Sequence, residues 1–411
     1  MQKRVVAAEA EVKIALVSPY DYAYPGGVTE HVRNLAEQFV RRGHDVHVIA
    51  PSSSPIVTRT AQPVVHRVGR PVPVPANGSV ARITLPLQGY RQVKHLLTFQ
   101  GFDVVHLHEP IMPALPLTVL HYSPAVNVGT FHALGRSDLA YHYAKPMLMP
   151  SFNRLHGRIA VSDAARDYVA RSFPGPYSVI PNGIDYARFA APHQPIGRFE
   201  DARLDVLFVG RLERRKGLEH LLRAWPLVRE VVPIARLLVV GGGRRLEGYR
   251  QWVRTHGWTD VHFIGHVAPN DLARYYQTSD VFCAPSTGQE SFGIVLLEAM
   301  AAGRAIVASR IPGYSEVLAD GVEGLLVEPR SASALASGLI RLLNDASLRR
   351  AMGARGREKA ATFDWPRVAG QVLDFYDTTI DAHLAEPTTH GSRVAGAFLR
   401  AATRAADRVA R

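Results

Sequence analysis

The chain has 411 residues and a formal net charge of +12, with 47% hydrophobic and 20% charged residues. At roughly 100–200 residues per domain, this composition predicts about two or three folded domains and excludes a disordered chain. The single cysteine, Cys283, excludes a disulfide scaffold or a cysteine-built zinc site and favours a reducing compartment. No secretory signal or membrane span is expected, because the first 12 residues lack an apolar core and prolines interrupt the uncharged stretch 110–135.

The positive charge is concentrated in two segments. Residues 46–102 contain six basic and no acidic residues, and residues 387–411 contain five arginines and one aspartate. Together they carry +10 of the +12, which favours an anionic partner over charge that serves only solubility. On a helix the tail arginines would form one stripe opposite a mainly alanine face, so a membrane surface is expected and nucleic acid is not. The candidate membrane contacts are Arg67, Arg70, Arg400 and Arg404.

The first half of the chain alternates strand-like and helix-like segments, which is typical of a parallel α/β sheet. Strands are expected over residues 13–18, 46–50, 104–107, 158–161 and 177–180. An amphipathic helix is expected over residues 28–42, ending at Gly43. Before it, Gly26 and Gly27 would let the backbone approach a ligand closely, and the helix N-terminus would offer free N–H groups to a phosphate.

His132 follows another strand-like segment and is expected to face a cleft. There it would bond a sugar hydroxyl or stabilise developing charge; the alternative is a structural role, since the chain has 18 histidines. His106 and His108 are interpreted as core and loop residues. No strong metal-ligand spacing occurs, so no metal site is predicted.

The apolar periodicity lapses over residues 194–203 and then restarts as a second α/β unit. A helix is expected over residues 218–228, and strands over residues 205–209, 236–240, 262–264, 281–284 and 305–308. The predicted organisation is a first unit over 12–190, a linker over 191–203 and a second unit over 204–365. Because ligands bind beyond the carboxyl ends of such strands, a cleft is expected between the units. Neither unit contains the GxGxxG fingerprint, so dehydrogenase chemistry is unsupported.

Arg211 and Lys216 lie after the first strand of the second unit. Two cations near a strand end can hold a diphosphate and neutralise the charge that develops as it leaves. The alternative is solvated surface charge, because Arg214 and Arg215 lie beside them. No Asp-x-Asp pair occupies a strand end, so these cations, and not a metal, are expected to serve the diphosphate.

Glu290 precedes an apolar helix that carries Glu298. At helical spacing the two carboxylates would lie about 12 Å apart, too far for a close dyad but suited to the two ends of one ligand. The intervening helix N-terminus would offer N–H groups to phosphate. The alternative is a capping carboxylate followed by an exposed helix glutamate.

With these motifs, the sequence resembles the retaining glycosyltransferases of the GT-B fold, in which two Rossmann-like domains face each other across a cleft. The motifs PGGV, Gly-Arg…Lys-Gly and ESFGIVLLEAMAAG occur in order, and the resemblance spans residues 13–381. Residues 77–82 and 129–132 carry a closer likeness to actinobacterial phosphatidylinositol mannosyltransferases that use GDP-mannose. The resemblance also implies a crossover helix over 366–385 that braces the first domain, followed by the basic amphipathic tail over 387–411.

The resemblance implies roles for individual residues. Arg211 and Lys216 would hold the diphosphate and Glu298 the ribose, while Glu290 and His132 would contact the transferred sugar. The implied catalytic residues are His132, Glu290, Arg211 and Lys216. The implied donor-binding residues are Gly26, Gly27, Arg211, Lys216, Glu290, Ser291, Phe292, Gly293, Ile294 and Glu298. The implied acceptor-binding residues are Tyr20, Thr29, Asn77, Ser79 and Arg82.

The leading hypothesis is a cytoplasmic, monomeric, peripheral membrane enzyme that moves a hexose, mannose, from GDP-mannose to a phospholipid head group without a cofactor or metal. The same chemistry on a soluble acceptor, such as an inositol phosphate, a thiol-precursor sugar or a glycan, is the first alternative. A nucleotide-sugar epimerase shares the two-domain fold but not the paired motifs. A nucleic-acid binder is the remaining alternative.

Overall fold

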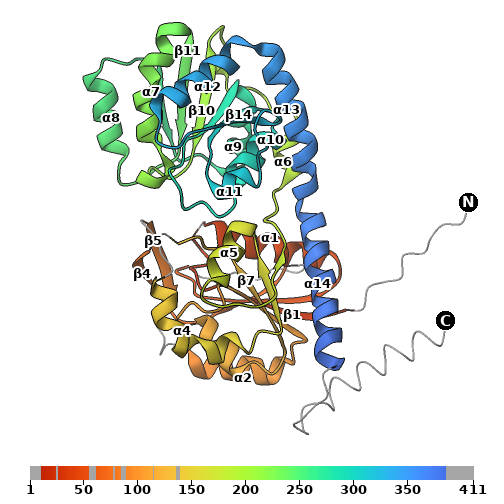
Figure 1. Cartoon of the computed structure of the whole chain (residues 1–411). Coiled ribbons are helices and arrows are strands. Elements are labelled where there is room, and N and C mark those ends of the chain that lie inside the picture. Colours follow the sequence, from red (N-terminus) through yellow and green to blue (C-terminus); the bar gives the residue numbers. More distant parts are fainter. Residues whose placement is uncertain are drawn as a thin grey trace, which may run out of the picture.

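The computed structural model describes residues 11–24, 26–54, 62–76, 79–84, 89–113, 115–135 and 139–385. These residues form two α/β units, one above the other, with two successive C-terminal helices along one side, the first beside the upper unit and the second beside the lower (Figure 1). The predicted fold class, two Rossmann-like domains with a crossover helix, is confirmed. The predicted tail contacts Arg400 and Arg404 and the acceptor residue Asn77 lie outside the described residues.

The N-terminal unit is built on a parallel sheet in the order β3-β2-β1-β6-β7-β8-β9. Alternate residues of the interior strand β1 pack into different cores: Ile14 and Leu16 lie on one face of the sheet, and Ala15 and Val17 lie on the other. Both faces are therefore buried, which explains why the strands are almost wholly apolar. The strands are β1 (Lys13–Val17), β2 (Asp45–Ala50), β3 (Val64–Arg67), β6 (Val104–His108), β7 (Val126–Phe131), β8 (Gly157–Ala160) and β9 (Ser178–Val179).

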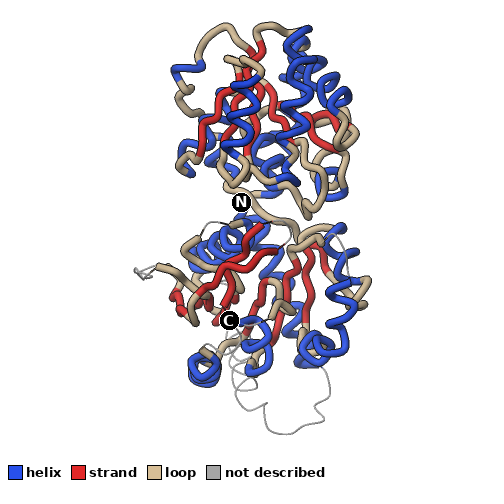
Figure 2. The backbone as a smooth tube through the Cα atoms, turned by 90° about the vertical axis from the view of Figure 1, so that its left-hand side faces the viewer, coloured by secondary structure: helices blue, strands red, loops and turns tan. Residues whose placement is uncertain are grey.

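The C-terminal unit repeats this plan with a parallel sheet in the order β12-β11-β10-β13-β14-β15. Helices again cover both faces of the strands (Figure 2). The strands are β10 (Leu204–Val209), β11 (Ala235–Val240), β12 (Val261–Gly265), β13 (Val281–Ala284), β14 (Ala305–Ser309) and β15 (Gly324–Val327).

Most helices connect one parallel strand to the next, because parallel strands need a crossover and cannot be joined by a tight turn. In the N-terminal unit they are α1 (Gly27–Arg41), α2 (Tyr90–Gln100), α3 (Leu115–Tyr122), α4 (Leu139–Phe152) and α5 (Asp163–Ala170), whereas the next helix, α6 (Tyr186–Ala190), packs into the core of the C-terminal unit through Phe189. In the C-terminal unit they are α7 (Leu218–Val231), α8 (Leu246–Thr255), α9 (Pro269–Thr278), α10 (Ile294–Ala301), α11 (Pro312–Ser315), α12 (Ala332–Asn344) and α13 (Ala346–Ala360). Short 3₁₀ turns occur at Gly197–Phe199, Arg214–Lys216 and Ala361–Phe363.

The sequence analysis missed a two-stranded antiparallel hairpin, β4 (Pro71–Ala76) with β5 (Ser79–Thr84). Three alternating prolines in β4 hid it, because proline cannot donate to a strand ladder and argues against a central strand. A two-stranded ribbon has free edges, so prolines are tolerated there. This hairpin bears on the site, because Tyr20 bridges to Ile83 of β5.

The last helix, α14 (Trp365–Ala385), leaves the C-terminal unit and packs on the N-terminal one (Figure 1). Its apolar stripe, which includes Trp365, Val368 and Tyr376, joins the core cluster of β1 and α1. The Tyr376 hydroxyl also lies 2.6 Å from Nδ1 of the buried His106. The helix is thus fixed to the N-terminal unit by burial of its own side chains.

Candidate active site

The carboxyl edges of the two sheets face each other. Helix α5 follows the carboxyl end of β8, and α11 follows the carboxyl end of β14. Across the two units, the carboxylate of Glu316, just after α11, accepts the backbone N–H groups of Asp163 and Ala164 at 2.8 and 2.7 Å. Because parallel strands end at one edge of a sheet, residues after the strand ends of both units meet in this region, where such folds bind ligands.

A group of largely buried charged side chains lies at the carboxyl edge of the C-terminal sheet. The carboxylate of Glu290 accepts Nη1 of Arg215 at 2.6 Å and Nζ of Lys216 at 2.8 Å. The three side chains are only 12%, 19% and 15% exposed, so water screens these contacts less than it would on an open surface. Strands β10 and β13 are neighbours in the sheet, which brings the two loops together.

Arg215 corrects the sequence analysis, which treated it as a surface neighbour of the diphosphate ligands. Its guanidinium also bonds Glu213 at 3.1 Å, and Glu213 pairs with Arg211 at 3.3 Å. Arg211 itself is 54% exposed. Three cations and two carboxylates leave this group with a net charge of +1, which suits an anionic ligand. In the sequence, the position of Arg215 directly before Lys216 was the signal that could have identified it as part of the site.

Glu290 does not lie on the helix that follows it. Helix α10 begins only at Ile294, so the helical spacing assumed between Glu290 and Glu298 is wrong. The loop is held closely instead: a Cβ added to Gly313 would meet the Glu290 carbonyl oxygen at 2.1 Å. Gly293 caps α10 with φ of 98°, a left-handed conformation that favours glycine.

The neighbouring loop residues have different exposures. The ring of Phe292 is buried against the core, so only its backbone can serve a ligand, whereas Ser291 and Ile294 are partly exposed.

Glu298 is not the exposed helix glutamate of the alternative interpretation. Its carboxylate accepts the Tyr276 hydroxyl at 2.7 Å. Burial raises the pKa of Glu298 to about 7, and the Tyr276 bond and the charges of Arg188 and Lys216 oppose that shift. A carboxylate buried among these groups could accept further hydroxyl groups from a ligand.

The first turn of α1 is open at Gly27. A Cβ added there would meet no atom of the described residues within 4 Å, and the capping residue Gly26 has extended backbone with no side-chain cap from that part of the chain. Free N–H groups at this helix start therefore face space that a phosphate can fill. By contrast, Thr29 is 2% exposed, so its side chain belongs to the core of the turn.

His132 is buried at the carboxyl edge of the N-terminal sheet, directly after β7. Its backbone N–H donates to the carboxylate of Glu109 at 2.9 Å, and its Nε2 lies 2.9 Å from Nδ1 of His108. Burial lowers the pKa of His132 well below the usual value, and the nearby His31 and His106 lower it further, so the ring is neutral at pH 7. A neutral imidazole here can donate or accept a hydrogen bond.

Glu109 was missed by the sequence analysis. It is 3% exposed, and burial raises its pKa to about 7 while the His132 and Ala133 backbone bonds oppose the shift. Its φ of 52° is uncommon for a residue other than glycine and marks a constrained strand end. Its position directly after the buried His106-x-His108 strand was the only signal.

The candidate acceptor residues lie where the hairpin meets β1. Besides the Tyr20–Ile83 bridge, the backbone N–H of Asp21 donates to the Arg82 carbonyl at 2.9 Å. The Arg82 guanidinium is half-exposed, 3.9 Å from the Asp21 carboxylate and stacked 4.5 Å from the Tyr24 ring centre. Ser79 begins β5. Tyr20 and Arg82 are therefore neighbours, and their predicted role in acceptor binding stays a prediction.

Two facing parallel sheets, with paired cations and glutamates on one edge and a buried histidine on the other, define a GT-B glycosyltransferase. The comparisons agree: residues 192–359 match the family model "Glycosyl transferases group 1", and residues 25–188 match "Glycosyltransferase Family 4". The chain belongs to the group 1 glycosyltransferases.

Individual relatives cover almost the whole chain. It is 40% identical to the phosphatidyl-myo-inositol mannosyltransferase of Mycobacterium tuberculosis (strain CDC 1551 / Oshkosh), over 89% of this chain and 97% of that protein. It is 39% identical to the protein of that name from Mycolicibacterium smegmatis, over 90% and 95%. The solved structure of sucrose-phosphate synthase from Thermosynechococcus elongatus matches with a TM-score of 0.71 and 25% identity, over 90% of this chain and all of that one.

Proposed function

We propose that this enzyme transfers mannose from GDP-mannose to a phospholipid head group such as phosphatidylinositol, with retention of the anomeric configuration. The observation that carries the proposal is the bonding of Glu290 to both Arg215 and Lys216 on one strand edge, opposite the edge that holds His132. Similarity over about nine-tenths of the chain to proteins named phosphatidyl-myo-inositol mannosyltransferase supports the sugar and the acceptor.

The donor diphosphate would bind between the cations and the start of α1. Arg211 and Lys216 would stabilise the charge that grows on the leaving diphosphate, which is greatest in the transition state. Gly27 leaves room for the phosphates, and Glu298 would accept the ribose hydroxyls. No step in this scheme needs a metal ion, so transfer should persist in excess EDTA.

The transferred sugar would lie between Glu290 and His132. When the diphosphate engages Lys216, the carboxylate of Glu290 becomes available to the sugar hydroxyls on the 3- and 4-side. His132, neutral and anchored by Glu109, would contact the 6-hydroxyl. The acceptor would approach past Tyr20 and Arg82 on the same face of the sugar as the leaving group.

The lipid acceptor requires contact with a membrane surface. Arg67 ends the edge strand β3 and Arg70 follows it, and both side chains are exposed. There they would meet anionic head groups, and each arginine would contribute about 1 kcal/mol to membrane binding. Across the described ranges, no helix is both long and apolar enough to cross a bilayer. We place the enzyme as a monomer on the inner face of the membrane, held peripherally.

The test is a transfer assay with GDP-mannose, vesicles containing phosphatidylinositol, and EDTA. Mannosylated lipid, identified by mass spectrometry, is the expected product, and binding to the vesicles should weaken as salt screens the charges. Two further arms replace the vesicles by a soluble inositol phosphate or omit the acceptor. Product only with the soluble acceptor would overturn the lipid assignment, and a changed nucleotide sugar without acceptor would indicate an epimerase.

The donor is tested separately by thermal shift with GDP-mannose, UDP-glucose, UDP-GlcNAc and ADP-glucose. A ligand that binds only the native state raises the melting temperature, so GDP-mannose should give the largest increase. A larger increase with another nucleotide sugar would contradict the proposed donor while leaving the class of enzyme intact.

A further inference from the structure

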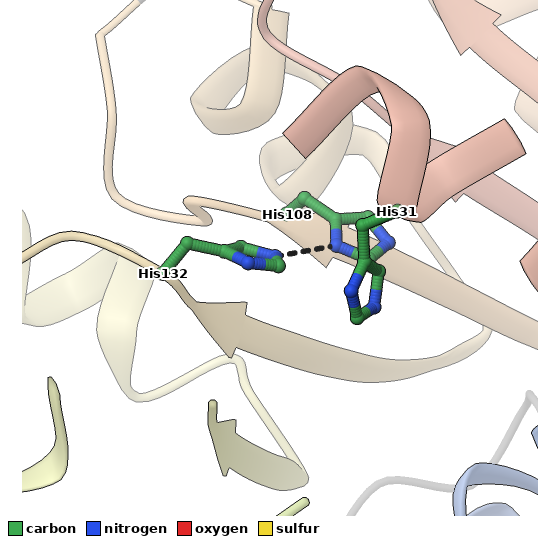
Figure 3. A group of neighbouring side chains, drawn as sticks. All are labelled: His31, His108 and His132. Carbon is green, nitrogen blue, oxygen red and sulfur yellow. Dashed lines mark hydrogen bonds between the residues drawn. The ribbon is translucent and has the colours of Figure 1, made fainter. Parts of the chain in front are cut away.

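Three buried imidazoles from distant parts of the chain meet beside the proposed sugar site. His31 comes from α1, His108 ends β6 and His132 follows β7 (Figure 3). One nitrogen of each ring can be chosen so that all three lie within 4.8 Å of one another. The three residues are 4%, 0% and 8% exposed, so the group is shielded from solvent.

Neighbouring groups already orient these rings. Nδ1 of His31 lies 2.8 Å from the Asn182 side-chain oxygen, so it carries the proton and leaves the Nε2 lone pair free. The Glu109 carboxylate fixes the backbone of His132 at 2.9 Å. A hydrogen bond to the second ring nitrogen is the usual way in which proteins set the tautomer of a metal-binding histidine.

The group also has an unmet bonding demand. His108 and His132 share a single proton across their 2.9 Å contact. The other nitrogen of His108, Nε2, is buried and has no hydrogen-bond partner among the described residues, which is unusual for a native structure. Imidazole nitrogens that face one another without a carboxylate between them suit divalent zinc, cobalt, nickel or copper.

We propose that His31, His108 and His132 form a three-histidine site for Zn²⁺, and that its occupation inhibits the enzyme. The ion takes the place of the proton shared by His108 and His132, which moves to the other nitrogen of its own ring so that both imidazoles stay neutral, and water completes a four-coordinate site. Metal binding stands on the geometry alone. The inhibition rests on the proposed function, because it withdraws the His132 lone pair from the sugar.

A second histidine pair provides the control. His47 of β2 and His66 of β3 have ring nitrogens 2.7 Å apart, and the Asp45 carboxylate lies 3.1 Å from the His47 ring. This pair could also take up a metal ion at the surface. The experiment is therefore done on full-length protein in both the wild-type and the His66→Gln background.

The test titrates the protein with Co²⁺, which gives visible absorption bands in a four- or five-coordinate nitrogen site. One Co²⁺ per chain should bind in both backgrounds and be displaced by Zn²⁺. His31→Gln should abolish the bands, and Asn182→Ala should weaken Co²⁺ affinity by about 10–100-fold. Circular dichroism checks folding, and if His31→Gln does not fold, the shift with Asn182→Ala decides.

Absence of bands in the wild type, or bands lost with His66→Gln but kept with His31→Gln, overturns the site. In the wild type, Zn²⁺ should inhibit sugar transfer and EDTA should restore it. In folded His31→Gln, the transfer rate with Zn²⁺ should equal the rate of the same variant in EDTA. Binding without inhibition overturns the inhibitory role. Co²⁺ binding with no transfer from any donor in EDTA would instead refute the proposed function and leave the metal site standing.

Discussion

Lys216 and Arg211 differ in surroundings although both are assigned to the diphosphate. Lys216 is 15% exposed and bonded to Glu290, whereas Arg211 is 54% exposed and bonded to Glu213. Electrostatic interactions are stronger where water is excluded. The two cations should therefore contribute unequally to catalysis.

Replacing either cation should slow transfer, Lys216 more than Arg211. Lys216→Ala should lower kcat/KM by about 10²-fold or more, the scale for loss of one charge-stabilising donor, and Arg211→Ala by less. The matched control is Arg214→Ala, an exposed arginine in the same turn that should leave kcat/KM unchanged. Steady-state kinetics that rank Lys216→Ala with Arg214→Ala would refute the assignment.

Glu298 should make stability depend on pH. Burial raises its folded pKa from 4.5 to about 7, so the folded state holds the proton more tightly than the unfolded state. Stability should then fall as pH rises between about 4.5 and 7 and level off above it. Glu298→Gln stays neutral and keeps an oxygen for Tyr276.

The melting temperature of Glu298→Gln relative to wild type should therefore increase from pH 5 to pH 8, as followed by calorimetry. Glu290→Gln provides the contrast, because it leaves Arg215 and Lys216 without their carboxylate and should lower the melting temperature at pH 8. A difference between Glu298→Gln and wild type that does not change with pH would contradict the burial argument.

At the scale of elements, a substitution at the start of α1 should change ligand affinity without lowering the stability of the fold. Gly27 is the first residue of the helix, where alanine has better propensity, and an added methyl group meets no atom of the described chain within 4 Å. Gly27→Ala should keep or raise the melting temperature, yet weaken binding of GDP, because the methyl occupies the space that the phosphates need.

The matched element is the short helix α11, where a Cβ added to Gly313 meets the Glu290 carbonyl at 2.1 Å. Gly313→Ala should lower both the melting temperature and GDP affinity, measured by calorimetry. Unchanged GDP affinity in Gly27→Ala would show that the diphosphate does not approach this helix start.

At the scale of the whole molecule, α5 shares its capping between the two units. Its own Ser162 accepts the Ala165 N–H, but the first two N–H groups bond Glu316 of the other unit. The contact therefore couples the relative position of the units to the end of one helix.

Glu316→Ala should destabilise the protein by about 1 kcal/mol, the usual scale of a lost helix cap, in urea unfolding. It should also widen the distribution of distances between the units in small-angle X-ray scattering. Glu316→Gln, which keeps an oxygen acceptor, should fall between Glu316→Ala and wild type. Equal scattering profiles for all three proteins would show that this contact does not hold the units together.

The sequence by itself determined the class of fold and the strand ends at which a ligand site is predicted. Apolar runs followed by turn glycines predicted the parallel strands and their carboxyl ends, and the predicted helix over 28–42 forms one residue earlier, as α1. Motifs that follow parallel strands lie at the carboxyl edge of their own sheet, so Gly27, Lys216 and Glu290 were predicted at the two facing edges without coordinates. The group 1 family was likewise predicted from these motifs and is confirmed.

Only the tertiary structure decided which side chains meet. His31 and Asn182 are 151 residues apart in sequence, and His106 and Tyr376 are 270 apart. No local pattern encodes such contacts, because they depend on strand order and on the return of α14. The same holds for Arg215 and for the proline-rich hairpin beside Tyr20. Periodicity reports whether a residue is buried, whereas packing between distant elements determines what it is buried against.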